Sequence, residues 1–330
     1  MRGEWGSVRF IANRSGFRYD RDVAHEKPSG TFRVILLGDS FVVGYRTDQE
    51  QTMGAHLERR LKPAVPSMTP QVLVAGHMHP GGYLRYLRKY AFRFHPDVIL
   101  VGITIGNDIT ESYRGARGER AWRRAVKHTF LPADAFDPSP TRNAFIRLDR
   151  SLQRWHLYRL LSAIQHRGGI FSMLGDYPGH VHVFDLSHGL AYFYTEEGLP
   201  LVRQAYQALA SFVGRMKGLC ESRQVPLVVM LLPQRFQVNT EEWEAVMFQY
   251  GLRESAFDPD RPSVVLDAQL RKIGVIPLDL TGPLRKGRDS YYMTNQDMHM
   301  NEAGQAASAA IILDEMQRRH LLPQRPHGAR

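Results

Sequence analysis

Residues 32–41 read Phe-Arg-Val-Ile-Leu-Leu-Gly-Asp-Ser-Phe, an apolar run that ends in a glycine, an acid and a serine. Continuous Val, Ile and Leu without alternation are typical of a strand buried on both faces of a parallel sheet. In such sheets, ligands bind beyond the carboxyl ends of the strands. Ser40 is therefore expected at the edge of the sheet where a substrate would bind.

Similar apolar runs alternate with helical patterns along much of the chain. The expected strands are Phe32–Leu37, Gln71–Ala75, Asp97–Thr104, Pro226–Leu232 and Val275–Leu280. The expected helices are Gln51–Leu61, Tyr83–Phe94, Leu201–Arg223, Glu241–Tyr250 and Asn301–Arg319. Strands that alternate with helices indicate an α/β protein, here a three-layer α/β/α sandwich with a central parallel sheet.

The alternation divides the chain into three parts. Residues 1–30 are expected to be an N-terminal leader segment, and residues 31–330 one domain. The alternation breaks at about 111–200, which shows no convincing strand and is interpreted as a mostly helical insertion. Two interpretations of the insertion stay open: a solvated helical subdomain, or a lid that shapes the substrate pocket.

Charge and hydropathy limit the classes of function. The 43 Lys and Arg residues exceed the 33 Asp and Glu residues, giving a net charge of +10, but they are spread among the expected helices. This predicts a modest preference for anionic surfaces and no nucleic-acid partner. No run approaches the roughly 18 apolar residues of a membrane span, and residues 1–5 lack the apolar core of a signal peptide. We expect a soluble chain of unknown location, although a misplaced start codon would remove an anchor without trace.

Three polar motifs supply the parts of a serine nucleophile site. A serine hydroxyl needs a base within hydrogen-bond reach and donors aimed at the developing oxyanion. His299 is the expected base, and Asp297 is expected to orient it. Asn107, which also follows a strand-like run, offers a side-chain amide, and the backbone N–H of Ser40 offers a second donor. The predicted triad is Ser40, Asp297 and His299, and it requires no cofactor or metal.

Each of these residues also has a structural interpretation. Ser40 could cap a helix, and Asn107 could be an Asx cap. His77 and His79 could suggest a metal site, but His-x-His without a further spaced ligand set is weak support. Cys220, the only cysteine, lies in an apolar helical pattern and is expected to be a buried structural thiol rather than a nucleophile.

The motifs resemble those of the SGNH, or GDSL-like, hydrolases, a family that includes bacterial serine esterases and acyltransferases. Ser40 lies in a Gly-Asp-Ser-Phe block and Asn107 in a Gly-Asn-Asp block. Asp297 and His299 form the Asp-x-His block, which continues as Asn-Glu-Ala-Gly at 301–304. The resemblance implies a flavodoxin-like fold with catalytic Ser40, Asp297 and His299, and with Asn107 in the oxyanion hole.

The glycine block of that family is matched less closely. The family often has Asn-x-Gly-x-x-Gly there, whereas residues 74–81 read Val-Ala-Gly-His-Met-His-Pro-Gly. The resemblance favours the Gly81 N–H as an oxyanion donor, with Gly82 and Gly76 as alternatives. Residues 13–18 also resemble the segment before the serine block in bacterial members, some associated with exopolysaccharide modification.

These observations favour a serine esterase that cleaves carboxylic esters through an acyl-enzyme, for example O-acetyl groups on a carbohydrate. The partner would be a small-molecule or carbohydrate ester. An O-acyltransferase that modifies a polysaccharide uses the same residues, so the sequence does not separate the two. From another class, a non-catalytic binder of an anionic or carbohydrate polymer stays open. The oligomeric state and any membrane anchoring are not visible in the sequence.

Overall fold

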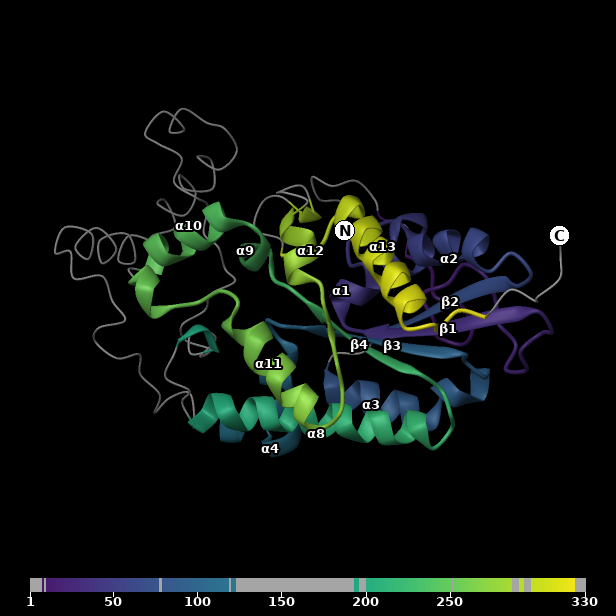
Figure 1. Ribbon diagram of the computed structural model, residues 1–330, viewed down its shortest axis with the longest axis horizontal. Coiled ribbons are helices and arrows are strands. Elements are labelled where there is room, and N and C mark those ends of the chain that lie inside the picture. Colours follow the sequence, from purple (N-terminus) through teal and green to yellow (C-terminus); the bar gives the residue numbers. More distant parts are fainter. Residues whose placement is uncertain are drawn as a thin grey trace, which may run out of the picture.

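A five-stranded parallel sheet forms the centre of the protein, in the order β2-β1-β3-β4-β5 (Figure 1). The computed structural model describes residues 8, 10–76, 79–118, 120–122, 193–195, 200–250, 252–286, 291–293 and 298–323. The strands are β1 (Thr31–Gly38), β2 (Thr69–Gly76), β3 (Val98–Thr104), β4 (Leu227–Leu232) and β5 (Leu278–Asp279). Strand order reverses direction at β1, so the connections that follow β1 and β3 leave towards opposite faces of the sheet.

Helices cover both faces of the sheet (Figure 1). One face carries α1 (Ser40–Val43), α2 (Met53–Ala64), α12 (Thr281–Lys286) and α13 (Glu302–Arg318). The other carries α3 (Pro80–Lys89), α4 (Asp108–Arg117), α8 (Pro200–Glu221) and α11 (Arg261–Lys272). The helices α9 (Arg235–Val238) and α10 (Thr240–Tyr250) follow β4, and short 3₁₀ helices lie at Gln49–Gln51, Ala91–Phe94 and Glu254–Ala256. The predicted three-layer α/β/α fold is confirmed.

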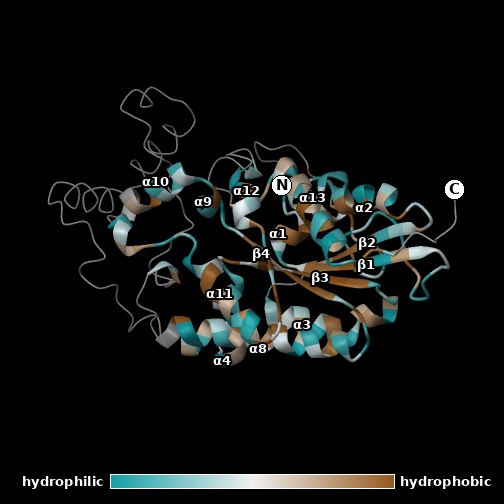
Figure 2. Cartoon of the chain, viewed as in Figure 1, coloured by the Kyte–Doolittle hydropathy of each residue, from teal (hydrophilic) through white to brown (hydrophobic). Residues whose placement is uncertain are grey.

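The apolar strands are buried on both sides, as their sequence predicts. Ile35 and Leu37 of β1 point into the core beneath α3 and α8, whereas Val34 and Leu36 point into the core beneath α2 and α13. The strands are hydrophobic over most of their length, with polar residues at the amino ends of β1 and β2, while many helix residues are hydrophilic (Figure 2). The strands β1, β2, β3 and β4 each contribute to two cores, which explains the absence of alternation in their sequences.

Two element boundaries differ from the prediction. The strand expected at Val275–Leu280 is limited to β5, because the Val275 N–H bonds to Leu270 O to close α11 and Pro277 has no N–H to donate. The helix expected at Tyr83–Phe94 begins at Pro80 and is α-helical only to Lys89. Proline suits the first turn, where the helix needs no N–H.

The predicted insertion falls mostly outside the described residues. Its first residues belong to α4 and its end meets α8, but residues 123–192 lie outside the description. The domain division and the role of the insertion therefore stay predictions. None of the described helices is both long enough and apolar enough to cross a membrane.

Candidate active site

Ser40 is the first residue of α1, directly beyond the carboxyl end of β1. This helix lies close to the sheet because β1 and β3 have glycines beneath it. A Cβ on Gly38 would lie 2.3 Å from Cγ2 of Val42, and a Cβ on Gly102 would lie 2.4 Å from the same atom. Side chains at these glycines would lift α1, so they determine how Ser40 sits above the sheet edge.

The structure brings Ser40 and His299 together. Ser40 Oγ lies 2.8 Å from His299 Nε2, although the two residues are 259 positions apart in the chain. The N-cap of α1 is Asp39, whose Oδ1 accepts from Phe41 N at 3.0 Å. Ser40 therefore does not cap the helix, and its hydroxyl is directed at the imidazole.

Two aromatic rings flank the His299 ring. The Phe41 ring centroid lies 5.1 Å from that of His299, and the Tyr45 centroid lies 5.0 Å from it. The backbone also holds this residue, because Met293 N donates to His299 O at 2.8 Å. The half-buried imidazole is thus contacted by two rings of the Ser40 segment, and a backbone bond holds the residue that carries it.

The Asn-Glu-Ala-Gly continuation anchors the histidine loop to α13. Asn301 is the N-cap, and its Oδ1 accepts from Gly304 N at 3.0 Å while its Nδ2 donates to Tyr292 O at 3.0 Å. A Cβ on Gly304 would lie 2.1 Å from Tyr291 O, so this approach requires glycine. These contacts fix the position of the His299 loop at the start of α13.

Asp39 joins Asn107 to the Ser40 turn. Asn107 Nδ2 donates to Asp39 Oδ2 at 3.0 Å, and Thr104 Oγ1 donates to Asp39 Oδ1 at 2.9 Å. Asn107 occupies the N-cap position of α4 without a capping side-chain bond, so the Asx-cap interpretation is wrong. Asp39 belongs to the Gly-Asp-Ser-Phe block, but no role is predicted for it from the sequence. Its position next to Ser40 is the feature of the sequence that could indicate one.

A second buried carboxyl group lies behind this one. Asp108 accepts from Tyr83 Oη at 2.9 Å and from Thr104 N at 2.9 Å. Burial raises the pKa of Asp39, and burial together with the charge of Asp39 raises the pKa of Asp108 well above its usual range. Two carboxylates enclosed this closely do not readily ionise together.

The three candidate oxyanion glycines lie in different environments. Gly76 belongs to the last register pair of β1 and β2. Gly82 N donates to His79 Nδ1 at 3.2 Å and to His79 O at 2.7 Å, so that N–H is already used. Gly81 is the second residue of α3, where a helix leaves its N–H groups unpaired. Of the three, Gly81 best retains a backbone donor.

Some predicted residues are placed elsewhere or not at all. Asp297 and His77 lie outside the described residues, so the third member of the triad stays a prediction. His79 is the N-cap of α3. Cys220 is buried in α8, and burial raises the pKa of its thiol to about 12, as expected for a structural cysteine.

Comparison with protein families gives one match in the C-terminal part. Residues 192–329 match the family described as "SGNH hydrolase-like domain, acetyltransferase AlgX". This part of the chain is similar to that SGNH hydrolase-like family. The matched range contains Asp297 and His299, whereas Ser40 and Asn107 precede it. The resemblance predicted from the sequence is thus confirmed in the half that carries the histidine.

Solved structures similar to this chain include three esterases. A two-domain esterase active on acetylated mannans has a TM-score of 0.43 and 10% identity over 91% of this chain, which spans 53% of that protein. The acetyl xylan esterase AlAXEase has a TM-score of 0.44 and 10% identity, covering 86% and 99% of the two chains. EstA from Pseudoalteromonas sp. has a TM-score of 0.41 and 11% identity, covering 87% and 98%. No curated protein matches the sequence.

Proposed function

We propose that this protein is a serine-dependent enzyme that cleaves carboxylic esters through an acyl-enzyme on Ser40. The observation that carries the proposal is the 2.8 Å contact between Ser40 Oγ and His299 Nε2. A hydroxyl paired with an imidazole at this distance has the geometry of a nucleophile and its general base. The match to the SGNH hydrolase-like family supports the same chemistry.

The first half-reaction forms the acyl-enzyme. Ser40 Oγ attacks the ester carbonyl carbon as His299 Nε2 takes the hydroxyl proton. The carbonyl oxygen becomes an oxyanion in the tetrahedral intermediate. His299 then gives the proton to the leaving-group oxygen as the bond between that alcohol oxygen and the carbonyl carbon breaks. The acyl group remains on Ser40.

Neutral hydrogen-bond donors stabilise the oxyanion in this proposal. The Ser40 N–H begins α1, where the helix leaves it unpaired. Asn107 has two amide hydrogens and gives one to Asp39, so the other is proposed to face the oxyanion. Gly81 N–H is the third proposed donor, and Asp297 is proposed to orient His299.

The second half-reaction decides between hydrolysis and transfer. If water attacks the acyl-enzyme the protein is an esterase, and if a hydroxyl of an acceptor attacks it is an acyltransferase. Transfer to a carbohydrate hydroxyl is the second candidate, because the matched family is described as an acetyltransferase. An acetyl group is accordingly the acyl group we propose for both reactions, with a carbohydrate ester as substrate.

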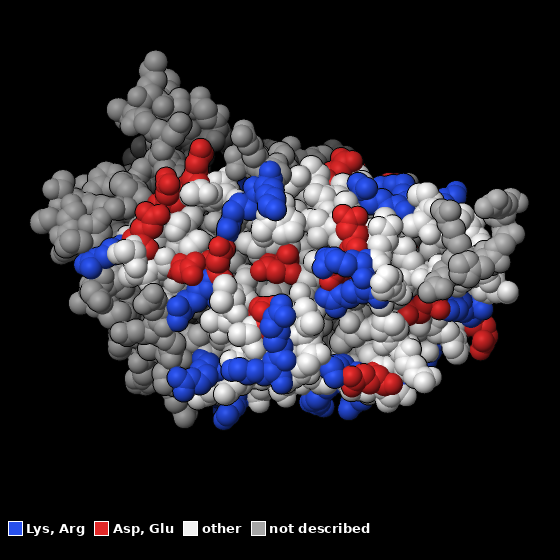
Figure 3. Space-filling view, in the orientation of Figure 1, with Lys and Arg blue, Asp and Glu red and all other residues white. Residues whose placement is uncertain are grey.

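The binding-only alternative is less well supported. A non-catalytic protein has no need for a serine hydroxyl directed at an imidazole that is itself held by two rings. On the described part of the face in Figure 3, acidic and basic side chains are interspersed. That distribution does not favour a polyanion-binding surface there.

The test measures the fate of the acetyl group of p-nitrophenyl acetate. Release of p-nitrophenol is followed for the wild type, for Ser40→Ala and for the control Ser222→Ala, whose exposed hydroxyl bonds to Leu219 O. We expect Ser40→Ala alone to abolish release. Mass spectrometry with and without an oligosaccharide acceptor then separates free acetate from acetylated sugar. Full activity in folded Ser40→Ala would reject the proposal.

A further inference from the structure

The leader segment packs against the edge strand of the sheet. Arg18 N donates to Val74 O at 2.8 Å, forming an antiparallel bridge between the leader and β2. Phe17 and Tyr19, on either side of Arg18, are buried. The leader is therefore part of the folded domain at this point, which places the Arg18 side chain inside the protein.

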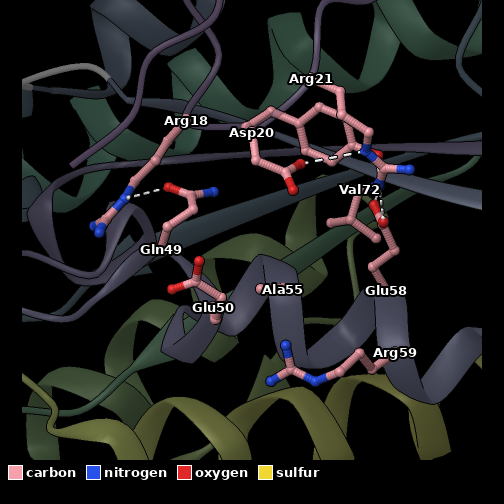
Figure 4. Close-up of a pocket in the computed structure, with 10 residues that line it drawn as sticks. Arg18, Asp20, Arg21, Gln49, Glu50, Ala55, Glu58, Arg59 and Val72 are labelled. Atoms are coloured by element: carbon pink, nitrogen blue, oxygen red, sulfur yellow. Dashed lines mark hydrogen bonds and ion pairs between the residues drawn. The ribbon is translucent and has the colours of Figure 1, made fainter. Parts of the chain in front are cut away.

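The guanidinium of Arg18 is buried and binds a set of neutral acceptors. Nη1 donates to Val43 O at 2.5 Å and to Gly44 O at 2.6 Å, and Nη2 donates to Thr47 O. Nε donates to Gln49 Oε1 at 3.2 Å, a contact visible at one end of the pocket in Figure 4. Burial lowers the pKa of Arg18 to about 10, so the group stays charged at neutral pH.

These acceptors lie at the C-terminal end of α1, the helix that begins with Ser40, and in the turn that follows it. A four-residue helix is too short to be stable by its own hydrogen bonds, and its last carbonyls have no partner within the helix. Gly44 ends α1 in the left-handed conformation, with φ of 74°. Arg18 donates to the last α1 carbonyl, Val43 O, and also to Gly44 O and Thr47 O in the following turn, with one rigid, forked group.

The same turn contacts the candidate catalytic pair. Tyr45, between the residues that Arg18 binds, donates its N–H to Ser40 O at 2.9 Å. Its ring lies 5.0 Å from the ring of His299. A displacement of the turn would therefore move both the Ser40 backbone and the Tyr45 ring that contacts the imidazole.

We propose that Arg18 is a positioning residue that holds the α1 turn, and through it Ser40 and His299, in the reactive arrangement. The proposal rests on the proposed function, because it assumes that Ser40 and His299 react. Arg18 acts through the backbone of 43–47 and does not touch the reacting atoms.

The test compares Arg18→Met, which keeps an unbranched apolar stem and removes the donors, with Arg18→Lys, which keeps the charge and loses the fork. The matched control is Arg14→Met, from the same leader, because Arg14 has an exposed guanidinium that pairs with Asp22. Steady-state kinetics on p-nitrophenyl acetate are measured where circular dichroism shows each variant to be folded. We expect kcat of Arg18→Met to fall about tenfold to a hundredfold with KM nearly unchanged. Arg18→Lys should lie between it and the wild type, and Arg14→Met should equal the wild type.

The outcomes separate the two proposals. A wild type without Ser40-dependent turnover rejects the proposed function. A wild type that is active, together with folded Arg18→Met of unchanged kcat, overturns the positioning role alone. If Arg18→Met does not fold, Arg18→Lys decides: a folded Lys variant with the kcat of the wild type contradicts the role, and a lowered kcat at unchanged KM supports it.

Discussion

Both ends of the central sheet bury charged side chains, but the groups that bind these side chains differ between the two ends. At the amino end, Arg33 of β1 donates to Phe94 O at 2.6 Å and to Gln71 Oε1 at 2.8 Å. Beside it, Lys27 Nζ lies 2.5 Å from Asp97 Oδ1. At the carboxyl end, Asp39 and Asp108 are two acids whose described hydrogen-bond donors are neutral.

This difference separates a structural arrangement from a functional one. Opposite charges and carbonyl acceptors at the amino end bind most of the polar groups that folding buries there, and Arg33 Nη2 is a buried donor left without a partner among the described residues. At the carboxyl end, each of the two buried acids makes ionisation of the other less favourable. Carboxyl groups with pKa values perturbed in this way are typical of functional sites. Substitutions at the amino end should therefore change stability without changing kcat, whereas substitutions at the carboxyl end should change activity or the pH dependence of stability.

The largest effect is expected for Asn107→Ala at the carboxyl end. Loss of one side-chain donor to the oxyanion should lower kcat by roughly 10²- to 10³-fold. Initial rates on p-nitrophenyl acetate measure it, with Gln71→Ala at the amino end as the control of unchanged kcat in folded protein. If kcat of Asn107→Ala is within about threefold of the wild-type value, Asn107 is not an oxyanion donor, because loss of even one donor lowers kcat far more.

An intermediate effect is expected for Arg33→Met at the amino end. The variant leaves Phe94 O and Gln71 without their donor inside the protein, which should lower the free energy of unfolding by about 3 kcal/mol. Urea denaturation gives this value, and kcat of the folded fraction should match the wild type. A large loss of kcat at unchanged stability would contradict the division between the two ends.

The smallest effect is expected for Asp108→Asn, in the pH dependence of stability. Because the folded-state pKa is raised, the folded protein keeps a proton that the unfolded chain releases above about 3.8. Stability contributed by that proton is present at low pH and is lost as pH rises through the folded-state pKa, by at most about 1.4 kcal/mol per pH unit. Asn cannot ionise, so the melting temperature of the variant should depend less on pH over that window. Asp22→Asn, which changes an exposed carboxyl, is the control, and parallel curves for Asp108→Asn and the wild type would show that Asp108 is ionised throughout.

The sequence predicted the parts of this fold that depend on local pattern. Four strands were predicted within two residues of their observed ends, because their apolar runs are continuous and end in turn residues. The expected helices do not include α4, whose range falls at the start of the predicted insertion. It predicts Ser40, Asn107 and His299 as members of one site; in the structure Ser40 contacts His299, and Asn107 bonds to Asp39, the residue before Ser40.

The sequence did not show how these residues are held. The contacts of Asp39 with Asn107 and of Arg18 with the α1 turn join segments far apart in the chain, and no local spacing reports them. The same holds for the Tyr45 ring against His299. Side-chain partners of this kind depend on tertiary packing, which periodicity and turn chemistry do not specify.

The most direct test of the central claim is labelling with a fluorophosphonate probe, followed by peptide mass spectrometry. The account predicts one adduct, on Ser40, that forms rapidly in the wild type, is absent in Ser40→Ala, and forms far more slowly in folded His299→Ala. An adduct on another residue, or labelling of Ser40 at the same rate without the imidazole, would contradict it.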